Sequence, residues 1–184
     1  KIEIDFLEKM KIPRYKVASL EINHTPLLKY IAKQGKPMIL STGVSRLSDI
    51  DHALETINTE GNNDISLLKC TTAYPTLPEE SELSHIKWLK EHYQLPVGLS
   101  DHSIGSLLSC MAIIKGAEVI EKHICLKNVK AVDSKFSLNE ADIKSFSNDI
   151  KNAYCLIKSK IFTRSKEELK NKIFRRSIFA IADI

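Results

Sequence analysis

Short apolar runs alternate along this chain with longer stretches in which apolar positions recur every three or four residues. Short runs rich in branched side chains are typical of buried strands, and the longer periodic stretches are typical of helices packed against them. The predicted strands are 14–18, 37–41, 65–70, 96–99 and 118–123, and the predicted helices are 4–10, 26–34, 45–59, 79–93 and 105–115. We expect the helix at 45–59 to begin at an N-cap at Ser45. Such regular alternation predicts an α/β fold with a parallel sheet.

The C-terminal part of the chain does not continue this alternation of strand and helix patterns. A last helix is predicted to begin at a cap supplied by Ser137 or Asn139 and to run to about Lys158. The lysine-rich stretch 159–172 has the composition of a solvated linker or surface helix, and 175–184 alternates like a strand that opens a new unit. We therefore predict a main domain at 1–158, a linker at 159–174 and the start of a further domain at 175–184.

Composition narrows the class of protein. At 184 residues, with 43% apolar and 27% charged side chains, the chain can bury one substantial core. Its formal charge of +4 comes from scattered lysines rather than one basic stripe, which argues against nucleic-acid binding. The four cysteines lack metal-knuckle spacing, which argues against disulfides and structural zinc. No apolar run approaches about 20 residues and the N-terminus carries no export signal, so we expect a cytoplasmic protein without membrane partners.

Polar side chains cluster just after the predicted strands. In chain order the strand ends carry Lys16, Ser19 and Glu21, then Ser41, then Thr72 and Tyr74, then Ser100, Asp101 and His102, and finally Glu121 and His123. In parallel α/β folds, binding and catalytic groups converge at the carboxyl ends of the strands. These side chains are therefore the candidates for a functional site.

His102 and His123 are the candidate metal ligands. Two neutral imidazoles at neighbouring strand ends suit a divalent ion that keeps open positions for substrate oxygen. We expect the preceding acids, Asp101 and Glu121, to serve as acceptors behind the histidines. The alternative for each histidine taken singly is an ordinary residue satisfied by a backbone carbonyl.

A second group of side chains has the chemistry of an anion site. One cation and four hydroxyls from four strand ends could hold a phosphate or carboxylate through charge-assisted hydrogen bonds; they are Lys16, Ser19, Ser41, Thr72 and Ser100. Serine and threonine after a strand also commonly cap the next helix. A lysine within a buried strand needs an anionic partner, so Lys16 favours the anion site. Tyr74, Glu21 and Asp133 could contact sugar hydroxyls, although a rigid turn at Tyr74 and solvated carboxylates at Glu21 and Asp133 are equally compatible with the sequence.

Periodicity leaves two architectures open, an open doubly wound sheet and the later part of an eight-stranded barrel. Five segments resemble, in order and spacing, the sialic acid synthase family. They are 15–21 (YKVASLE), 37–43 (PMILSTG), 67–75 (LLKCTTAYP), 98–102 (GLSDH) and 119–123 (VIEKH). Within that family, 98–106 and 133–137 are more similar to the branch that makes pseudaminic acid, because Val132 stands where neuraminate synthases usually have a proline.

The resemblance implies a partial (β/α)8 TIM barrel, comprising about strands 4–8, and the start of a C-terminal antifreeze-like (SAF) domain. It implies a metal-dependent condensation of phosphoenolpyruvate with an acetamido sugar, here a 6-deoxy diacetamido hexose, in a homodimeric full-length enzyme. By the same resemblance His102 and His123 hold Mn²⁺ or Mg²⁺, and Glu121 acts as an acid/base or water-positioning group. Phosphoenolpyruvate is expected at Lys16, Ser19, Ser41, Thr72 and Ser100, and the sugar at Glu21, Tyr74 and Asp133.

Other functions remain open at this point. N-acetylneuraminate or legionaminate could be the product instead. A different barrel aldolase would form a Schiff base between pyruvate and Lys16. The chain could also be a truncated, non-catalytic remnant, and we expect it to be inactive alone because an open half-barrel exposes two strand edges.

Overall fold

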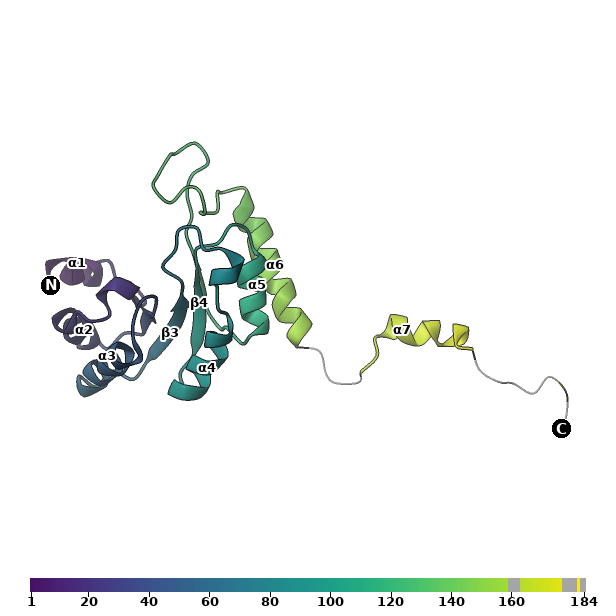
Figure 1. Cartoon of the computed structure of the whole chain (residues 1–184), viewed down its shortest axis with the longest axis horizontal. Helices are drawn as coiled ribbons and strands as arrows, with labels where there is room; N and C mark the ends of the chain where they lie inside the picture. Colours follow the sequence, from purple (N-terminus) through teal and green to yellow (C-terminus); the bar gives the residue numbers. More distant parts are fainter. Residues whose placement is uncertain (159–162, 177–181, 183–184) are drawn as a thin grey trace.

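Five parallel strands form one curled sheet whose spatial order follows the sequence. The computed structural model describes residues 1–158, 163–176 and 182 of the chain. The strands are β1 (Tyr15–Val17), β2 (Met38–Ser41), β3 (Ile65–Cys70), β4 (Val97–Asp101) and β5 (Ile120–Lys122), paired in that order (Figure 1). All four neighbouring pairs are parallel. The predicted α/β fold is confirmed, and of the two architectures left open the sheet takes the half-barrel.

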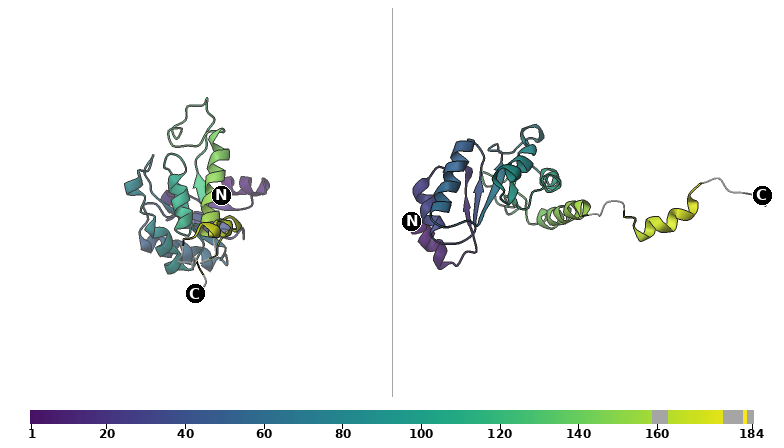
Figure 2. Two further views of the ribbon diagram at one scale, coloured as in Figure 1. Left: turned by 90° about the vertical axis from the view of Figure 1, so that its right-hand side faces the viewer. Right: turned by 90° about the horizontal axis from the view of Figure 1, so that it is seen from below.

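Helices join successive strands, as parallel pairing requires. The connecting helices are α2 (Thr25–Ala32), α3 (Leu47–Thr59), α4 (Ser84–Tyr93) and α5 (Leu107–Ile114), with short 3₁₀ turns η1 (Ser19–Glu21) and η2 (Pro78–Glu80). In addition, α1 (Ile2–Lys9) precedes β1 and α6 (Asp142–Ile157) follows β5. α4 packs on β3 and β4, and α5 packs on β4. α2 packs beside α3, and α6 packs beside α5 (Figure 2).

Alternation along each strand divides its side chains between two faces. One face enters a single buried cluster with the helices, and its members include Tyr15, Val17, Met38, Leu40, Leu67, Val97 and Leu99 from strands and Leu28, Ile31, Ile57, Ile86 and Ala112 from helices. The intervening residues point to the opposite, inner face of the curled sheet. Because polar candidates such as Lys16, Ser41 and Ser100 alternate with core residues, they share the inner face.

Gly98 lets β4 and β5 approach closely. A Cβ atom at this position would lie 2.2 Å from the carbonyl oxygen of Val119 and 2.7 Å from Cδ2 of Leu68. No other residue fits without moving the backbone, because the nearest atom belongs to the main chain. This glycine therefore sets the spacing of the two strands that carry both candidate histidines.

Several predicted boundaries were wrong by a few residues. The helix predicted from Ser45 begins at Leu47, with Arg46 as the N-cap, because the Asp49 carboxylate accepts a hydrogen bond from the Arg46 amide at 2.8 Å. The helix predicted at 79–93 is split into η2 and α4. The strand predicted to end at Leu99 continues to Asp101, because backbone pairing with β5 extends to Lys122.

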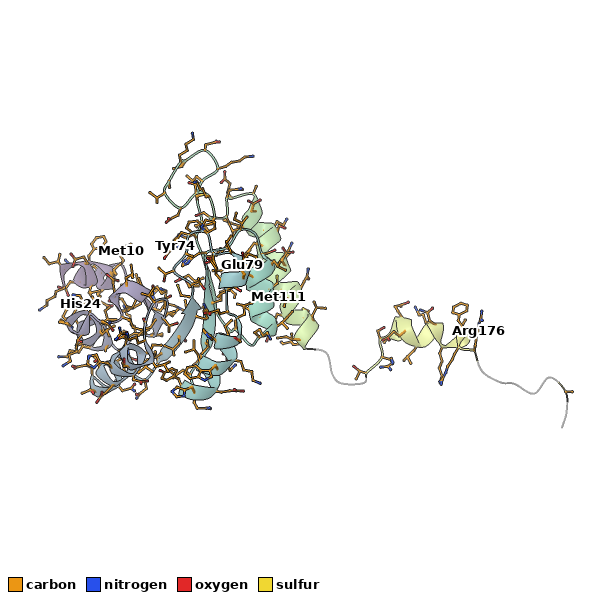
Figure 3. All side chains as sticks on the ribbon, viewed as in Figure 1. Met10, His24, Tyr74, Glu79, Met111 and Arg176 are labelled. Atoms are coloured by element: carbon orange, nitrogen blue, oxygen red, sulfur yellow. The ribbon has the colours of Figure 1, made fainter. Side chains whose placement is uncertain are left out.

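The C-terminal region retains the predicted helical features. α6 begins at Asp142 with Ala141 as its N-cap, so the cap predicted at Ser137 or Asn139 was wrong. Asn139 Oδ1 instead accepts hydrogen bonds from the amides of Ala141 and Asp142 in the turn that leads into α6. Beyond it, α7 (Lys166–Lys170) and η3 (Asn171–Phe174) are exposed, and Arg176 lies far from the sheet (Figure 3). The strand predicted at 175–184 falls mostly outside the described residues. None of the helices formed by the described residues combines the length and apolar character needed to cross a bilayer.

Candidate active site

The ends of β4 and β5 present consecutive side chains to opposite faces of the sheet. Ser100 and His102 face the inner side, where the Ser100 hydroxyl lies 3.5 Å from His102 Nε2. Asp101, between them, is fully buried on the helix side and lies 3.2 Å from the ammonium of Lys122. Glu121 returns to the inner face, within reach of Ser100. Because successive side chains along a strand point to opposite faces, the candidate reactive groups lie on the inner face and the buried ion pair lies on the helix side.

His102 is held as a neutral imidazole with a defined tautomer. Its Nδ1 lies 2.9 Å from the carbonyl oxygen of Thr71, and because a carbonyl can only accept, Nδ1 carries the proton. Burial is the main cause that lowers the pKa of His102, and nearby His123 adds to it, while the Thr71 carbonyl opposes the shift. The lone pair is consequently on Nε2, which faces the inner side of the sheet beside Ser100.

His123 lies beside His102 in a cluster of rings. The two imidazole centroids are 5.2 Å apart, and His123 Nδ1 lies 3.3 Å from a carboxylate oxygen of Asp133. Phe136 is buried, with its centroid 5.1 Å from that of His123, and the Tyr74 ring is tilted by 39° against His102 with centroids 4.4 Å apart. The apolar ring of Phe136 thus fixes the two imidazoles from one side while Tyr74 leaves 52% of its surface exposed.

A chain of polar contacts links the inner faces of β4, β5 and β1. The Ser100 hydroxyl donates to Glu121 Oε1 at 2.7 Å, and Glu121 Oε2 lies 3.5 Å from the Lys16 ammonium. Lys16 also donates to the carbonyl of Val17 at 3.0 Å. The expectation that Lys16 is buried within its strand was wrong, since 32% of its side chain is exposed on the open inner face. Its anionic partner is Glu121.

Hydroxyl groups without partners lie beside this chain of contacts. Ser41 Oγ and Thr72 Oγ1 are buried and make no hydrogen bond within the described structure. Gly43 closes the same corner, because a Cβ there would come within 2.6 Å of the Ser19 and Thr72 hydroxyls. A buried hydroxyl that lacks a partner costs about 1–3 kcal/mol, so such an arrangement is expected where a ligand supplies the acceptor.

The three predicted sugar contacts fall in two places. Tyr74 and Asp133 line a cavity of about 370 Å³ together with His123, Val132, Lys135 and Phe136. Glu21 instead lines a recess next to β1 with Lys16 and His24. The structure therefore brings Tyr74 and Asp133 to the histidine pair and places Glu21 on the lysine side.

The predicted support of the histidines requires correction. Asp101 does not lie behind His102, because it points to the helix side and pairs with Lys122. The acceptor for His102 is the Thr71 carbonyl, and the acceptor for His123 is Asp133 rather than Glu121. Strand alternation excludes Asp101 and could have been applied to the sequence, whereas a backbone acceptor leaves no sequence signal. Sequence reasoning did not single out Phe136, whose ring lies against both histidines.

The donor set is compatible with a divalent metal. His102 Nδ1 is hydrogen-bonded to the Thr71 carbonyl, and His123 Nδ1 lies 3.3 Å from the Asp133 carboxylate. Nε2 of each ring is then the nitrogen available to a metal, as is usual for metal-binding histidines. No cluster of three or more histidine, cysteine or acidic side chains with metal-site geometry exists among the described residues. The pair could therefore supply two ligands of a site whose other positions are open to water or substrate oxygen.

The carboxyl ends of the parallel strands thus carry paired imidazoles, a lysine–glutamate pair and hydroxyls without partners. This is the end of the sheet at which α/β barrels place their binding and catalytic groups. The NeuB family model matches residues 1–161. The chain is 40% identical over its whole length to the pseudaminic acid synthase of Campylobacter jejuni, of which it covers 54%. It is 39% identical to the N,N'-diacetyllegionaminic acid synthase of the same species, with 98% of the chain and 55% of that enzyme covered.

Among solved structures, the spore coat polysaccharide biosynthesis protein SpsE of Bacillus subtilis superimposes with a TM-score of 0.81 at 39% identity. The match covers 90% of this chain and 47% of that one. The chain belongs to the NeuB family. It spans about half the length of the curated relatives that it matches.

Proposed function

We propose that the protein containing this chain condenses phosphoenolpyruvate with an acetamido sugar to give a nonulosonic acid and phosphate. The observation that carries the proposal is the pair of buried hydroxyls without partners, Ser41 Oγ and Thr72 Oγ1, beside the Gly43 corner. A phosphate or carboxylate group supplies several acceptor oxygens to such hydroxyls. The Lys16 ammonium on the same inner face adds the positive charge that a doubly anionic substrate requires.

The proposed sugar is 2,4-diacetamido-2,4,6-trideoxy-altrose, which gives pseudaminic acid. Identity alone does not separate this product from legionaminic acid, because the two Campylobacter relatives differ by one percentage point. The choice rests on the segment 132–137, which lines the cavity beside His123 and Tyr74. Val132 replaces a proline found in neuraminate synthases, and the exposed Tyr74 ring and Phe136 offer apolar contact to a deoxygenated sugar carbon.

In this proposal the residues of the chain position the reactants and neutralise charge. Lys16 and the hydroxyls of Ser19, Ser41, Thr72 and Ser100 hold phosphoenolpyruvate, and Tyr74 and Asp133 hold the sugar. C3 of the enol attacks the aldehyde carbon, a new C–C bond forms, water adds at C2, and phosphate leaves with cleavage of the C–O bond. Glu121, which already accepts a hydrogen bond from the Ser100 hydroxyl, holds the attacking water at C2.

His102 and His123 would hold a divalent ion, Mn²⁺ or Mg²⁺, through their Nε2 atoms. When bound, such an ion supplies Lewis-acid polarisation of the sugar aldehyde. The chain itself contributes the orientation: the Thr71 carbonyl accepts a hydrogen bond from His102 Nδ1, and the Asp133 carboxylate lies 3.3 Å from His123 Nδ1, which leaves Nε2 of each ring for the ion.

The test is phosphate release from phosphoenolpyruvate by the full-length protein in the presence of Mn²⁺, with the altrose sugar and with N-acetylmannosamine. We expect release with the altrose sugar and a KM for phosphoenolpyruvate that rises at least about tenfold in Ser41→Ala, because one hydrogen bond to a charged group is lost. Ser48→Ala is the matched control, since Ser48 is exposed on α3.

Two results would contradict the proposal. Release with N-acetylmannosamine alone would reassign the sugar while leaving the reaction class intact. Borohydride trapping of pyruvate on Lys16 would replace the reaction class by a Schiff-base aldolase, since the condensation proposed here forms no imine.

A further inference from the structure

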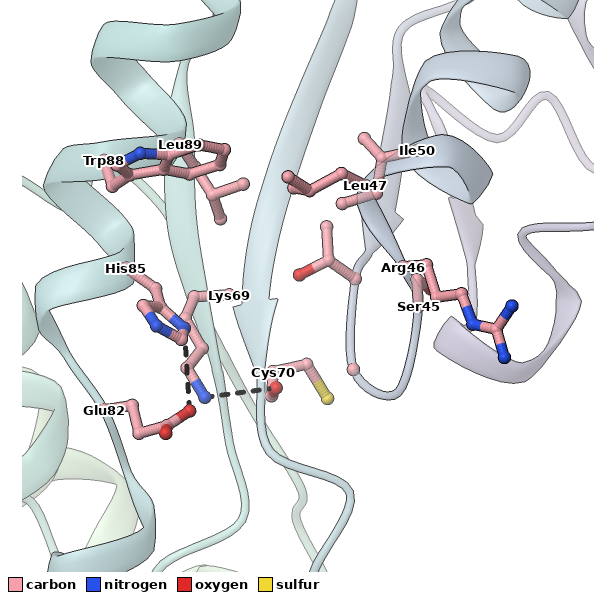
Figure 4. Close-up of a pocket in the computed structure, with 12 residues that line it drawn as sticks. Ser45, Arg46, Leu47, Ile50, Lys69, Cys70, Glu82, His85, Trp88 and Leu89 are labelled. Atoms are coloured by element: carbon pink, nitrogen blue, oxygen red, sulfur yellow. Dashed lines mark hydrogen bonds and ion pairs between the residues drawn. The ribbon is translucent and has the colours of Figure 1, made fainter.

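A second cavity lies on the opposite side of the sheet from the candidate active site. It has a volume of about 500 Å³ and opens between the loop that follows β2, the beginning of α3 and α4 (Figure 4). Its walls are apolar at one end, where Leu47, Ile50, Trp88 and Leu89 meet. The other end is polar and contains Lys69, Glu82 and His85. None of these residues takes part in the proposed condensation.

Lys69 is the anchor of this cavity. It is 5% exposed, and its ammonium donates to the Thr71 hydroxyl at 2.6 Å and to the Cys70 carbonyl at 3.3 Å. An ammonium group has three protons, so one remains for a further acceptor. Burial lowers the pKa of Lys69, and the Glu82 carboxylate opposes this effect only in part. A buried, incompletely paired ammonium gains more from an added anion than an exposed one does.

Two further observations point to a ligand rather than to a satisfied core lysine. Ser45 Oγ lines the same cavity, is buried, and has no hydrogen-bond partner within the described structure. The Glu82 carboxylate lies beside His85 at 3.6 Å, and no carboxylate of the described residues lies within 4 Å of the Lys69 ammonium. The cavity therefore offers one donor from Lys69 on one wall and one hydroxyl from Ser45 on the opposite wall, next to an apolar chamber.

We propose that this cavity binds a small organic acid, with its carboxylate at Lys69 and its apolar body between Trp88 and Leu89. The volume suits a ring or a branched chain of modest size, as ligand cavities usually begin at about 300 Å³. The inference does not depend on the proposed condensation, because Lys69, Trp88 and Leu89 take no part in it, although the cavity also touches Gly43 and Cys70 at the strand ends.

The ligand would also have a path to the active site. Lys69 holds the hydroxyl of Thr71, and the carbonyl of Thr71 fixes the tautomer of His102. An acid that draws the Lys69 ammonium toward the cavity would therefore change its hydrogen bond to Thr71, and with it the position of the Thr71 carbonyl that orients His102.

Trp88 makes the test direct, because it is the single tryptophan of the chain and lines the cavity. The probe is cyclohexanecarboxylate, which is transparent at the excitation wavelength, and the matched neutral probe is cyclohexanecarboxamide. pH is held constant because His92 stacks on Trp88 at 4.5 Å and its protonation would alter the fluorescence. We expect a saturable change with the carboxylate and at least about tenfold weaker binding of the amide.

Lys69→Met should weaken the carboxylate at least about tenfold, whereas Lys115→Met, an exposed lysine at the end of α5, should not change it. Methionine has a similar shape and removes a buried charge, so we expect the variant to fold. If it does not fold, the comparison of acid and amide on the unaltered chain decides the question. Equal binding of the two probes, no saturable change at millimolar concentrations, or complete displacement by phosphoenolpyruvate overturns the proposal.

Discussion

The buried ion pair between Asp101 and Lys122 should make a large contribution to stability. The Asp101 side chain is fully buried and that of Lys122 is 5% exposed, with 3.2 Å between carboxylate and ammonium. Asp101 also accepts hydrogen bonds from the Ser103 amide and hydroxyl, each at 2.7 Å, and from the Ser109 hydroxyl. In Lys122→Met the carboxylate keeps these neutral donors but loses its only cation within 4 Å among the described residues.

We expect Lys122→Met to lower the free energy of unfolding by about 3 kcal/mol, because removing one partner leaves an uncompensated buried charge. Urea unfolding followed by far-UV circular dichroism measures the change. With a slope of about 2 kcal/mol per molar urea, the midpoint should fall by roughly 1.5 M. The double variant Asp101→Asn/Lys122→Met should recover part of the loss, since the buried charge is then gone as well.

Lys90→Met is the matched control. Lys90 and Glu118 form a shorter contact, 2.5 Å, but their side chains are 45% and 49% exposed. Solvent screening limits such a pair to about 0.5 kcal/mol. Equal losses for the Lys122 and Lys90 variants, or a loss below about 1 kcal/mol for Lys122→Met, would show that burial of the pair is not what stabilises this end of the sheet.

Three further predictions follow from the same geometry. Gly98→Ala should destabilise the chain by about 2–3 kcal/mol in the same urea assay, because its Cβ would lie 2.2 Å from the Val119 carbonyl oxygen. NMR titration should place the pKa of His102 below 6.5; the unfolded chain then binds the proton more readily, so the stabilisation is lost as pH falls from 6.5 toward that lowered pKa. Ser41→Ala should leave the thermal midpoint unchanged or raise it, because the Ser41 hydroxyl is buried without a partner in the free protein.

The sequence predicted the order and type of elements well because each strand is short, apolar and bounded by a long periodic helix. The register of polar residues at strand ends was also accessible, and it placed Ser100, His102 and Glu121 in one cluster. Local hydrogen bonds place some helix and strand ends a few residues away from the predicted positions. The start of α3 depends on which side chain accepts a hydrogen bond from the amides at the helix end. The Asp49 carboxylate accepts one from the Arg46 amide, and Arg46 rather than Ser45 is the N-cap.

Features that depend on which face a residue occupies were harder to predict. Lys16 and Lys69 are both lysines within strands, but Lys16 lies on the open inner face and Lys69 is buried among helices. Residue type alone does not distinguish these two lysines. They differ in which face of the sheet their position in the strand gives to the side chain, because successive side chains point to opposite faces. Assigning alternate residues of each strand to opposite faces would have placed Asp101 and Lys122 together on the helix side, since each lies next to a candidate residue of the inner face.

The hydrogen bond from His102 to the Thr71 carbonyl has a consequence for how this site can change. In many histidine sites the orienting acceptor is a carboxylate, which a single codon change removes. Here the acceptor belongs to the main chain, so every residue type at position 71 supplies the same oxygen. Side-chain scanning at position 71 would thus register only the loss of the Thr71 hydroxyl and overlook the group that fixes the imidazole. Replacing the peptide bond after Thr71 by an ester, which weakens that carbonyl as an acceptor, would address the tautomer directly.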